Sequence, residues 1–154
     1  MYRYIAIFIT LILIYTASTA EALEIKIEDK NKDGKPDLWI YYDNGKPVKM
    51  ESDRNYDGVI DIRITYKEKG EKLVEVDLNF DGIYDMRSYY KYGERVKFEI
   101  DTNYDGLLDQ RSEYSGNRTI KLERDTNNDG KLETLFDRSD QGSNVIKNNP
   151  IIKK

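Results

Sequence analysis

The sequence predicts an all-β protein made of five 24-residue strand-turn-strand repeats that are joined by acidic loops. A nine-residue segment rich in Asp and Asn begins at residues 29, 53, 77, 101 and 125, so each start lies 24 residues after the previous one. Apolar and polar residues alternate after each segment, which is typical of half-buried strands. Helices are not expected, because frequent Gly, Asn and Asp interrupt any apolar stripe with a period of 3.6 residues.

The first residues of the 154-residue chain differ from the repeats. Residues 1–4 carry one positive charge, residues 5–15 are apolar, and small residues follow up to Ala22. This order is typical of a secretory signal peptide cleaved after Ala20 or Ala22. An uncleaved anchor is the alternative, but the apolar run is shorter than the roughly 20 residues that span a bilayer. We therefore predict a signal peptide at 1–20, a β-repeat domain at 21–154, and a secreted or periplasmic protein.

Composition excludes several classes of function. The chain has no Cys, so it forms no disulfide, and no His, so Ser/His/Asp and Cys/His nucleophiles and the usual zinc sites are absent. Its 25 basic and 29 acidic residues give a net charge of -4, which becomes -5 once a signal peptide containing only Arg3 is removed. No basic stripe suited to nucleic acid is present. We expect no nucleic-acid partner, and no membrane contact after signal cleavage.

Each repeat is expected to form a hairpin. In residues 60–66, Ile60, Ile62, Ile64 and Tyr66 share one strand face. Glycine-containing turns follow near residues 43, 67, 91, 115 and 140, and alternation then resumes, as in residues 96–100. The first repeat should place strands at about 37–42 and 48–51. Since the turn glycine shifts by one residue between repeats, three-residue turns with β-bulges are expected.

One register satisfies both faces of these hairpins. Pairing Ile64 with Val74 puts Ile62 opposite Val76 on the apolar face and Arg63 opposite Glu75 on the polar face. The same register downstream pairs Met86 with Ile100, Ser88 with Phe98, Tyr90 with Val96, Arg87 with Glu99, Ser112 with Leu122, Tyr114 with Ile120, and Arg111 with Glu123.

The arrangement of the whole sheet stays open at this point. The strands could form an antiparallel meander or a solenoid with two strands per repeat, and the apolar face could pair with a second chain through Tyr42, Tyr66, Tyr90 and Tyr114. The last repeat loses the pattern, because its second strand is NVIKNN with Asn144 at the paired position. We expect that strand to cap the sheet or to fray.

The acidic loops have the form DxNxDGxxD, which suits calcium. Calcium takes six to eight oxygen ligands, and a short loop wraps the ion only if ligands alternate with spacers. Side chains at positions 1, 3, 5 and 9 and the carbonyl at position 7 would bind, and Gly at position 6 would make the turn. Magnesium usually keeps several waters and so suits such a cage less well. The alternative is that Asp and Asn only form turns, but five copies favour calcium.

These positions define the predicted calcium ligands, with the fifth loop expected to bind more weakly because Glu replaces Asp at position 9. They are Asp29, Asn31, Asp33, Lys35 and Asp37 in loop 1 (residues 29–37); Asp53, Asn55, Asp57, Val59 and Asp61 in loop 2 (53–61); Asp77, Asn79, Asp81, Ile83 and Asp85 in loop 3 (77–85); Asp101, Asn103, Asp105, Leu107 and Asp109 in loop 4 (101–109); and Asp125, Asn127, Asp129, Lys131 and Glu133 in loop 5 (125–133).

The loops resemble the calcium loops of EF-hands, dockerins, thrombospondin type 3 repeats and integrin-type propellers. Over residues 28–148 the whole unit is similar to tandem calcium-loop repeats of exported bacterial proteins. The resemblance implies calcium binding. It does not imply the helix-opening switch of EF-hand sensors, because the bidentate Glu expected at loop position 12 is replaced by Ile40, Ile64, Ser88, Ser112 and Phe136.

The expected function is that of a secreted structural or interaction module whose sheet is stabilised by calcium. Fifteen of the 29 acidic side chains occupy ligand positions and would repel one another without cations. The alternative is an adhesion module in which exposed aromatics on the polar face, such as Trp39, Tyr41 and Tyr89, bind an extracellular glycan or protein. An enzyme is not expected, since no repeat carries an acidic pair that the others lack.

Overall fold

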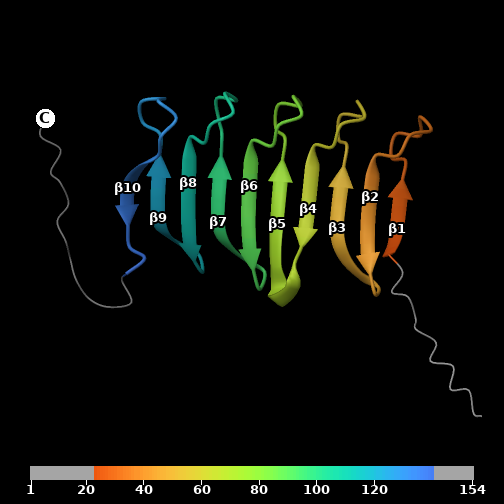
Figure 1. Cartoon of the computed structure of the whole chain (residues 1–154), viewed down its shortest axis with the longest axis horizontal. Helices are drawn as coiled ribbons and strands as arrows, with labels where there is room; N and C mark the ends of the chain where they lie inside the picture. The colour runs from red at the N-terminus through yellow and green to blue at the C-terminus, as the bar shows by residue number, and fades with distance from the viewer. Residues whose placement is uncertain (1–22, 141–154) are drawn as a thin grey trace, which may run out of the picture.

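The computed structural model describes residues 23–140, which form one open sheet of ten antiparallel strands (Figure 1). Strand order in the sheet follows chain order, so the all-β prediction is confirmed and the meander is the arrangement adopted. The signal peptide predicted at 1–20 and the strand predicted at 144–149 lie outside the described residues. The elements are β1 (Leu23–Glu28), β2 (Leu38–Asp43), β3 (Lys46–Ser52), β4 (Ile62–Tyr66), the 3₁₀ turn η1 (Glu68–Gly70), β5 (Glu71–Val76), β6 (Met86–Lys91), β7 (Glu94–Ile100), β8 (Gln110–Ser115), β9 (Arg118–Arg124) and β10 (Glu133–Asp137).

The register predicted from face matching is confirmed over most of its length. Ile64 lies opposite Val74 and Arg63 opposite Glu75. Downstream, Ser88 faces Phe98 and Ser112 faces Leu122. A one-residue slip would move every apolar side chain to the other face, so alternation alone specifies this pairing.

Strand β1 was not predicted, because it precedes the first acidic loop, where the 24-residue pattern begins. It pairs with β2 and places Ile25 opposite Tyr41 and Ile27 opposite Trp39. The two isoleucines therefore lie on the polar face of the sheet, and both are exposed. The alternation of Leu23, Ile25 and Ile27 was the available signal.

The turn between β4 and β5 contains three residues, Glu68–Gly70, and the Lys67 N–H donates to the Glu71 carbonyl at 2.8 Å across it, so the prediction of three-residue turns is confirmed there. It is wrong for the other three hairpins, whose turns contain two residues, but the predicted bulges are present in those three. Asp43 pairs with Lys46 across Asn44 and Gly45, which have φ of 49° and 72°, as a type I′ turn requires. A shift in register follows in each of these hairpins. Because of it, Tyr90 faces Arg95 and not Val96, and Tyr114 faces Thr119 and not Ile120.

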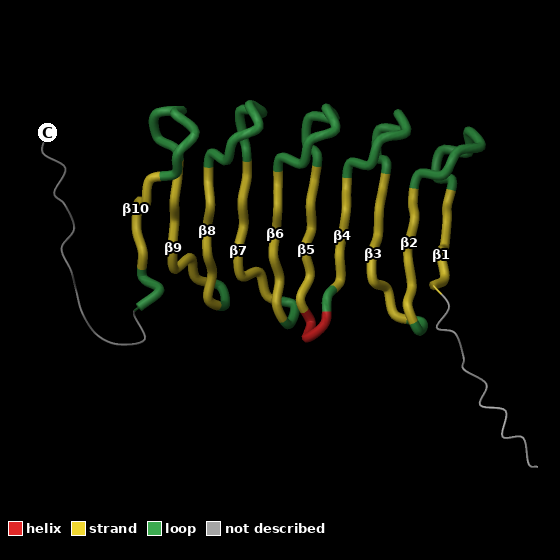
Figure 2. Tube along the Cα trace, in the orientation of Figure 1, coloured by secondary structure: helices red, strands yellow, loops and turns green. Residues whose placement is uncertain are grey.

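The described residues form a single layer with almost no apolar core (Figure 2). Val76 is the one buried hydrophobic residue among them. The other buried residues are Asp, Glu and Ser, so polar networks take the place that a second layer occupies in most domains.

A charge ladder crosses the polar face, formed by Glu51, Arg63, Glu75, Arg87, Glu99, Arg111 and Glu123, each opposite the next. Each arginine lies opposite the glutamate predicted for it. Most of the ion pairs, however, are with the glutamate on the preceding strand. Arg63 contacts Glu51 at 2.9 Å and Arg87 contacts Glu75 at 3.3 Å, whereas Arg111 contacts both Glu99 at 2.8 Å and Glu123 at 3.5 Å. Each arginine lies between two glutamates, and opposition alone does not decide which one it bonds.

Aromatics on the polar face belong to this network. Trp39, Tyr41 and Tyr89 are half-buried, so the expectation that they are exposed is wrong. The Tyr89 hydroxyl donates to Glu99 at 2.9 Å, and Lys97 Nζ lies 3.9 Å from the centre of the Tyr89 ring. Burial by itself raises the pKa of Glu99, but hydrogen bonds from Arg111, Tyr89 and Lys97 outweigh it and hold that pKa below its usual value. The Lys97 ammonium therefore covers part of the Tyr89 ring.

Candidate metal centre

The five acidic loops lie at one end of the strands, and the hairpin turns lie at the other end (Figure 2). We call the row of loops the loop edge. The loops join β1 to β2, β3 to β4, β5 to β6, β7 to β8 and β9 to β10. A meander returns the chain to the same edge after every two strands. All predicted ligands are therefore gathered at one end of the strands.

Loop 2 shows how the ligand positions are held. Both oxygens of Asp53 accept backbone N–H groups at 2.7 Å, one from Tyr56 and one from Gly58. Tyr56 and Gly58 have φ of 66° and 95°, which turns the loop around the carboxylate. The side chain of Asn55 accepts the N–H of Asp57 at 3.1 Å and donates to its carboxylate at 2.8 Å. Positions 1, 3 and 5 are thereby brought together.

Position 9 closes the loop with a buried carboxylate. Asp61 is fully buried, and its Oδ2 accepts the N–H of Arg54 at 2.5 Å and of Asn55 at 3.3 Å. The side chain is thus directed into its own loop. Its other oxygen, Oδ1, is buried with no hydrogen-bond partner. A buried carboxylate oxygen without a donor is unfavourable by itself, so this atom indicates a missing cation or donor.

The same contacts recur in the other loops, with small differences at position 9. In loop 4, the backbone N–H and hydroxyl of Thr102 both donate to Asp109. The hydroxyl bond is the largest cause of a lowered Asp109 pKa, which the buried neighbour Asp125 opposes. In loop 1, the N–H of Lys35 and the amide of Asn31 lower the pKa of Asp33. In both cases these hydrogen bonds favour the ionised form of the carboxyl group.

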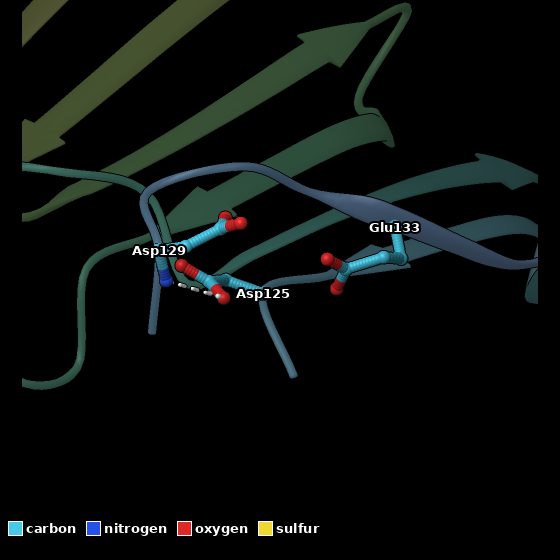
Figure 3. Close-up of side chains that lie close together, drawn as sticks. All are labelled: Asp125, Asp129 and Glu133. Carbon is cyan, nitrogen blue, oxygen red and sulfur yellow. Dashed lines mark hydrogen bonds between the residues drawn. The ribbon is translucent and has the colours of Figure 1, made fainter. Parts of the chain in front are cut away.

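Loop 5 differs because Glu133 takes position 9. Its Oε2 accepts from the N–H of Thr126 at 2.9 Å and from its hydroxyl at 3.0 Å. Carboxylate oxygens of Asp125, Asp129 and Glu133 lie within 4.8 Å of one another (Figure 3). Figure 3 shows the backbone N–H of Asp129 donating to the Asp125 carboxylate, with the carboxylates of Asp129 and Glu133 beside it. This cluster of three carboxylates could hold a metal ion.

Successive loops are joined by backbone hydrogen bonds. The N–H at position 1 of each later loop donates to the position 9 carbonyl of the loop before it, as in Asp53 to Asp37 at 2.9 Å and Asp77 to Asp61 at 2.8 Å. Seven aspartates at these junctions are buried, which forms a row of negative charge along the loop edge. They are Asp37, Asp53, Asp61, Asp77, Asp85, Asp101 and Asp125.

Two features of the loops were missed by sequence reasoning. Thr102 and Thr126 add a hydroxyl donor to the position 9 carboxylate, and their shared place at position 2 was the available signal. Position 4 is left-handed in all five loops, with φ between 58° and 66°. At position 7, the contribution that the structure shows is the N–H, which donates to position 5, as from Val59 to Asp57 at 2.7 Å.

Comparison with known proteins adds no family. No protein-family model matches the chain, and no curated protein sequence is significantly similar to it. Within residues 23–140, no helix has the length and apolar character needed to cross a membrane. The chemistry of the loops themselves therefore carries the functional argument.

Proposed function

We propose that this chain is an exported calcium-binding repeat protein, whose single-layer sheet is stabilised by calcium in the acidic loops. The observation that carries the proposal is Asp61, a fully buried carboxylate directed into loop 2 with one unpartnered oxygen. A divalent cation in that loop would satisfy the oxygen and offset the surrounding negative charge.

The ligand chemistry favours calcium among divalent cations. Every predicted side-chain ligand is a carboxylate or an amide oxygen, and no His or Cys is present to attract zinc or copper. The convergent carboxylates of Asp125, Asp129 and Glu133 support the same reading in loop 5. Because no loop has a bidentate Glu at position 12, affinities near the 10⁻⁴ to 10⁻³ M range of extracellular modules are expected.

Bound calcium would stabilise the folded sheet and would take no part in a reaction. Val76 is the one fully buried hydrophobic residue in the described part, and the other apolar strand residues are at most half-buried, so the single layer gains less from apolar burial than a two-layer domain would. Ligands that come together only in the folded state convert binding free energy into folding free energy. We therefore propose a structural or interaction role with no catalytic activity, for which the repeated loops serve as staples.

Isothermal titration calorimetry of the mature protein tests the proposal. Calcium should bind with a stoichiometry close to the five loops of the sequence, and magnesium should bind more weakly. The Asp61→Asn variant should lose affinity at one site and keep the others. Absence of calcium heat at millimolar concentration would contradict the metal reading.

A further inference from the structure

Strand β1 is one of the two end strands of the open sheet, so one side of its backbone has no neighbouring strand among the described residues (Figure 1). The N–H and C=O groups along such a free side can pair with a further strand. All six residues of β1 pair with β2 without a shift in register. The other end strand, β10, has five residues and a register shift between Thr134 and Phe136. A bulge of that kind disfavours strand pairing, so β1 is the end of the sheet that is open to it.

The polar face of the sheet becomes apolar at β1. The row that contains the charge ladder continues from Glu51 to Trp39 in β2 and ends at Ile27 in β1, whereas at the opposite end of the sheet it ends at Thr134. Three aliphatic side chains of β1 lie on this face with 62%, 46% and 53% of their surface exposed; they are Leu23, Ile25 and Ile27. Pairing with β2 alone therefore leaves an aliphatic strip uncovered beside the free side of β1.

The charged side chains of β1 lie on the other face, where the rest of the sheet is apolar. Lys26 lies opposite Ile40, and Glu24 and Glu28 share its face because side chains alternate along a strand. Lys26 contacts Glu28 at 2.7 Å. Glu24 is exposed and has no ion pair among the described residues. The free side of β1 is therefore flanked by a cation and by an anion that still lacks a partner.

Antiparallel pairing of β1 with the β1 of a second copy has one register that suits both faces. Opposite residues of an antiparallel pair lie on the same face, so two identical strands pair in registers centred on a residue. The register centred on Ile25 places Leu23 opposite Ile27 of the second copy on one face. On the other face it places Glu24 opposite Lys26, once on each side of the twofold axis. The register centred on Lys26 pairs as many residues, but it places two lysines opposite each other, which is unfavourable.

Segments of the same chain are too short to fill the free side of β1. Strands β1 and β10 lie at opposite ends of the sheet (Figure 1), nine strand spacings or about 43 Å apart. Residues 141–154 could span about 48 Å if fully extended, so almost none of them would remain to pair with β1. Signal cleavage after Ala20 or Ala22, as predicted, would leave at most two residues before Leu23. Charge complementarity and chain length thus both favour a second copy.

We infer that β1 is a dimerisation strand, which pairs antiparallel with β1 of a second copy of this chain in the register centred on Ile25. The dimer is one continuous sheet with ten strands from each copy. Both free sides of β1 are used in the pair, so the assembly closes at two copies. One short strand from each copy is a small interface beside the standard of about 800 Å² per partner, so a dissociation constant roughly in the micromolar range is expected. This inference goes beyond calcium binding and does not depend on it.

Sedimentation equilibrium of the mature protein in calcium tests the inference through the paired charges. Glu24→Lys creates facing cations and Lys26→Glu creates facing anions, so each single variant should dimerise about tenfold more weakly than the wild type. The double variant that carries both substitutions restores opposite charges and should dimerise like the wild type. An equimolar mixture of the two single variants should form a mixed dimer, because each supplies the charge that the other lacks. Both side chains are exposed, so the variants should fold, which circular dichroism checks.

The control is Leu135→Lys in β10, where Leu135 is 49% exposed, and it should leave dimerisation unchanged. Association lost in this control, or a mass that rises beyond the dimer, would show that β10 takes part and would overturn the pairing of β1. A wild type that stays monomeric up to roughly millimolar concentration would overturn it too. So would single variants that dimerise like the wild type, or a double variant that stays weak. Calcium calorimetry on the same samples keeps the two proposals distinct, because a dimer without calcium heat would support the pairing of β1 and overturn the proposed function.

Discussion

Loops 2 and 5 have the same ligand pattern but close in different ways. In loop 2, the short side chain of Asp61 is drawn fully inside, where one of its oxygens has no partner. In loop 5, the longer Glu133 stays half-buried, and its carboxylate meets those of Asp125 and Asp129 near the surface. The two loops thus differ in whether the closing carboxylate is buried with an unpartnered oxygen or meets other carboxylates near the surface.

The two loops should therefore differ in how much a bound calcium ion stabilises them. A buried, unsatisfied carboxylate destabilises the metal-free sheet and gains most from a cation, whereas solvent screens a cluster at the rim. Loop 2 also lies between neighbouring loops on both sides, to which backbone hydrogen bonds join it. Central loops should therefore couple calcium to folding more strongly than the last loop.

The largest expected effect is a change of sign in Asp61→Asn. Without calcium, the neutral amide removes an unsatisfied buried charge and should stabilise the sheet by about 1 to 3 kcal/mol. With calcium at 100 times the dissociation constant, loss of the site should destabilise it by up to about 2.7 kcal/mol. Thermal unfolding in calcium and in chelator measures both, with an osmolyte added to populate the chelated fold.

Glu133→Gln is the matched control for this reversal. Its carboxylate is half-buried and hydrogen-bonded to Thr126, so both effects should be smaller. An Asp61→Asn variant destabilised equally with and without calcium would show that Asp61 has only a structural role.

The next effect compares Asp81→Ala in loop 3 with Asp129→Ala in loop 5. Both side chains accept the N–H of position 7, at 2.8 Å from Ile83 and 3.0 Å from Lys131, so the two variants lose similar local bonds. Repeat units interact mainly with their neighbours, so damage to a central loop should spread further. In calcium, Asp81→Ala should lower the melting temperature by roughly 10 °C, and Asp129→Ala by less. Equal shifts, measured by circular dichroism, would mean that the loops act independently.

A smaller effect is expected from a substitution in the sheet, away from the calcium loops. Glu99 bonds Arg111, Lys97 and Tyr89 on the polar face. Replacing it by Gln should reduce the free energy of unfolding by about 1.5 kcal/mol, because charged hydrogen bonds are lost. The loss should be the same in calcium and in chelator with osmolyte. A loss of unfolding free energy seen only in calcium would show that the charge ladder and the metal sites are coupled, and that sheet and loops do not contribute separately.

The smallest effect concerns Glu133→Asp. The shorter side chain has one fewer rotatable bond to fix, so calcium affinity at loop 5 should rise by about threefold. Titration calorimetry of the weakest site, compared with the wild type, gives the change. Weaker calcium binding by the variant would show that Glu at position 9 suits the loop 5 site better than Asp.

Alternation and turn residues were sufficient to predict the sheet and much of its register. The pairing of Arg63 with Glu75 followed from which faces match. The position of Tyr90 did not, because a bulge beside a two-residue turn adds a residue that face matching does not reveal. Strand β1 was not predicted although its residues alternate, because it lies before the first acidic loop and outside the 24-residue pattern.

The candidate site was predictable as a set of residues but not as an arrangement. Spacing indicated that Asp53, Asn55, Asp57 and Asp61 belong together, and the loop hydrogen bonds bring them together. The burial of Asp61 depends on neighbouring loops packed against it, and the convergence around Glu133 depends on side-chain length and rotamer. The first feature comes from packing between loops and the second from side-chain conformation within one loop, and residue spacing specifies neither.

If calcium holds this single-layer sheet together, thermal unfolding of the wild type should differ sharply between calcium and chelator. Circular dichroism should show a cooperative β-sheet transition in millimolar calcium. In chelator, the spectrum at room temperature should be that of a largely unfolded chain, and added calcium should restore the sheet. An unchanged spectrum and an unchanged melting temperature in chelator would show that the hairpins fold without metal and would contradict the account.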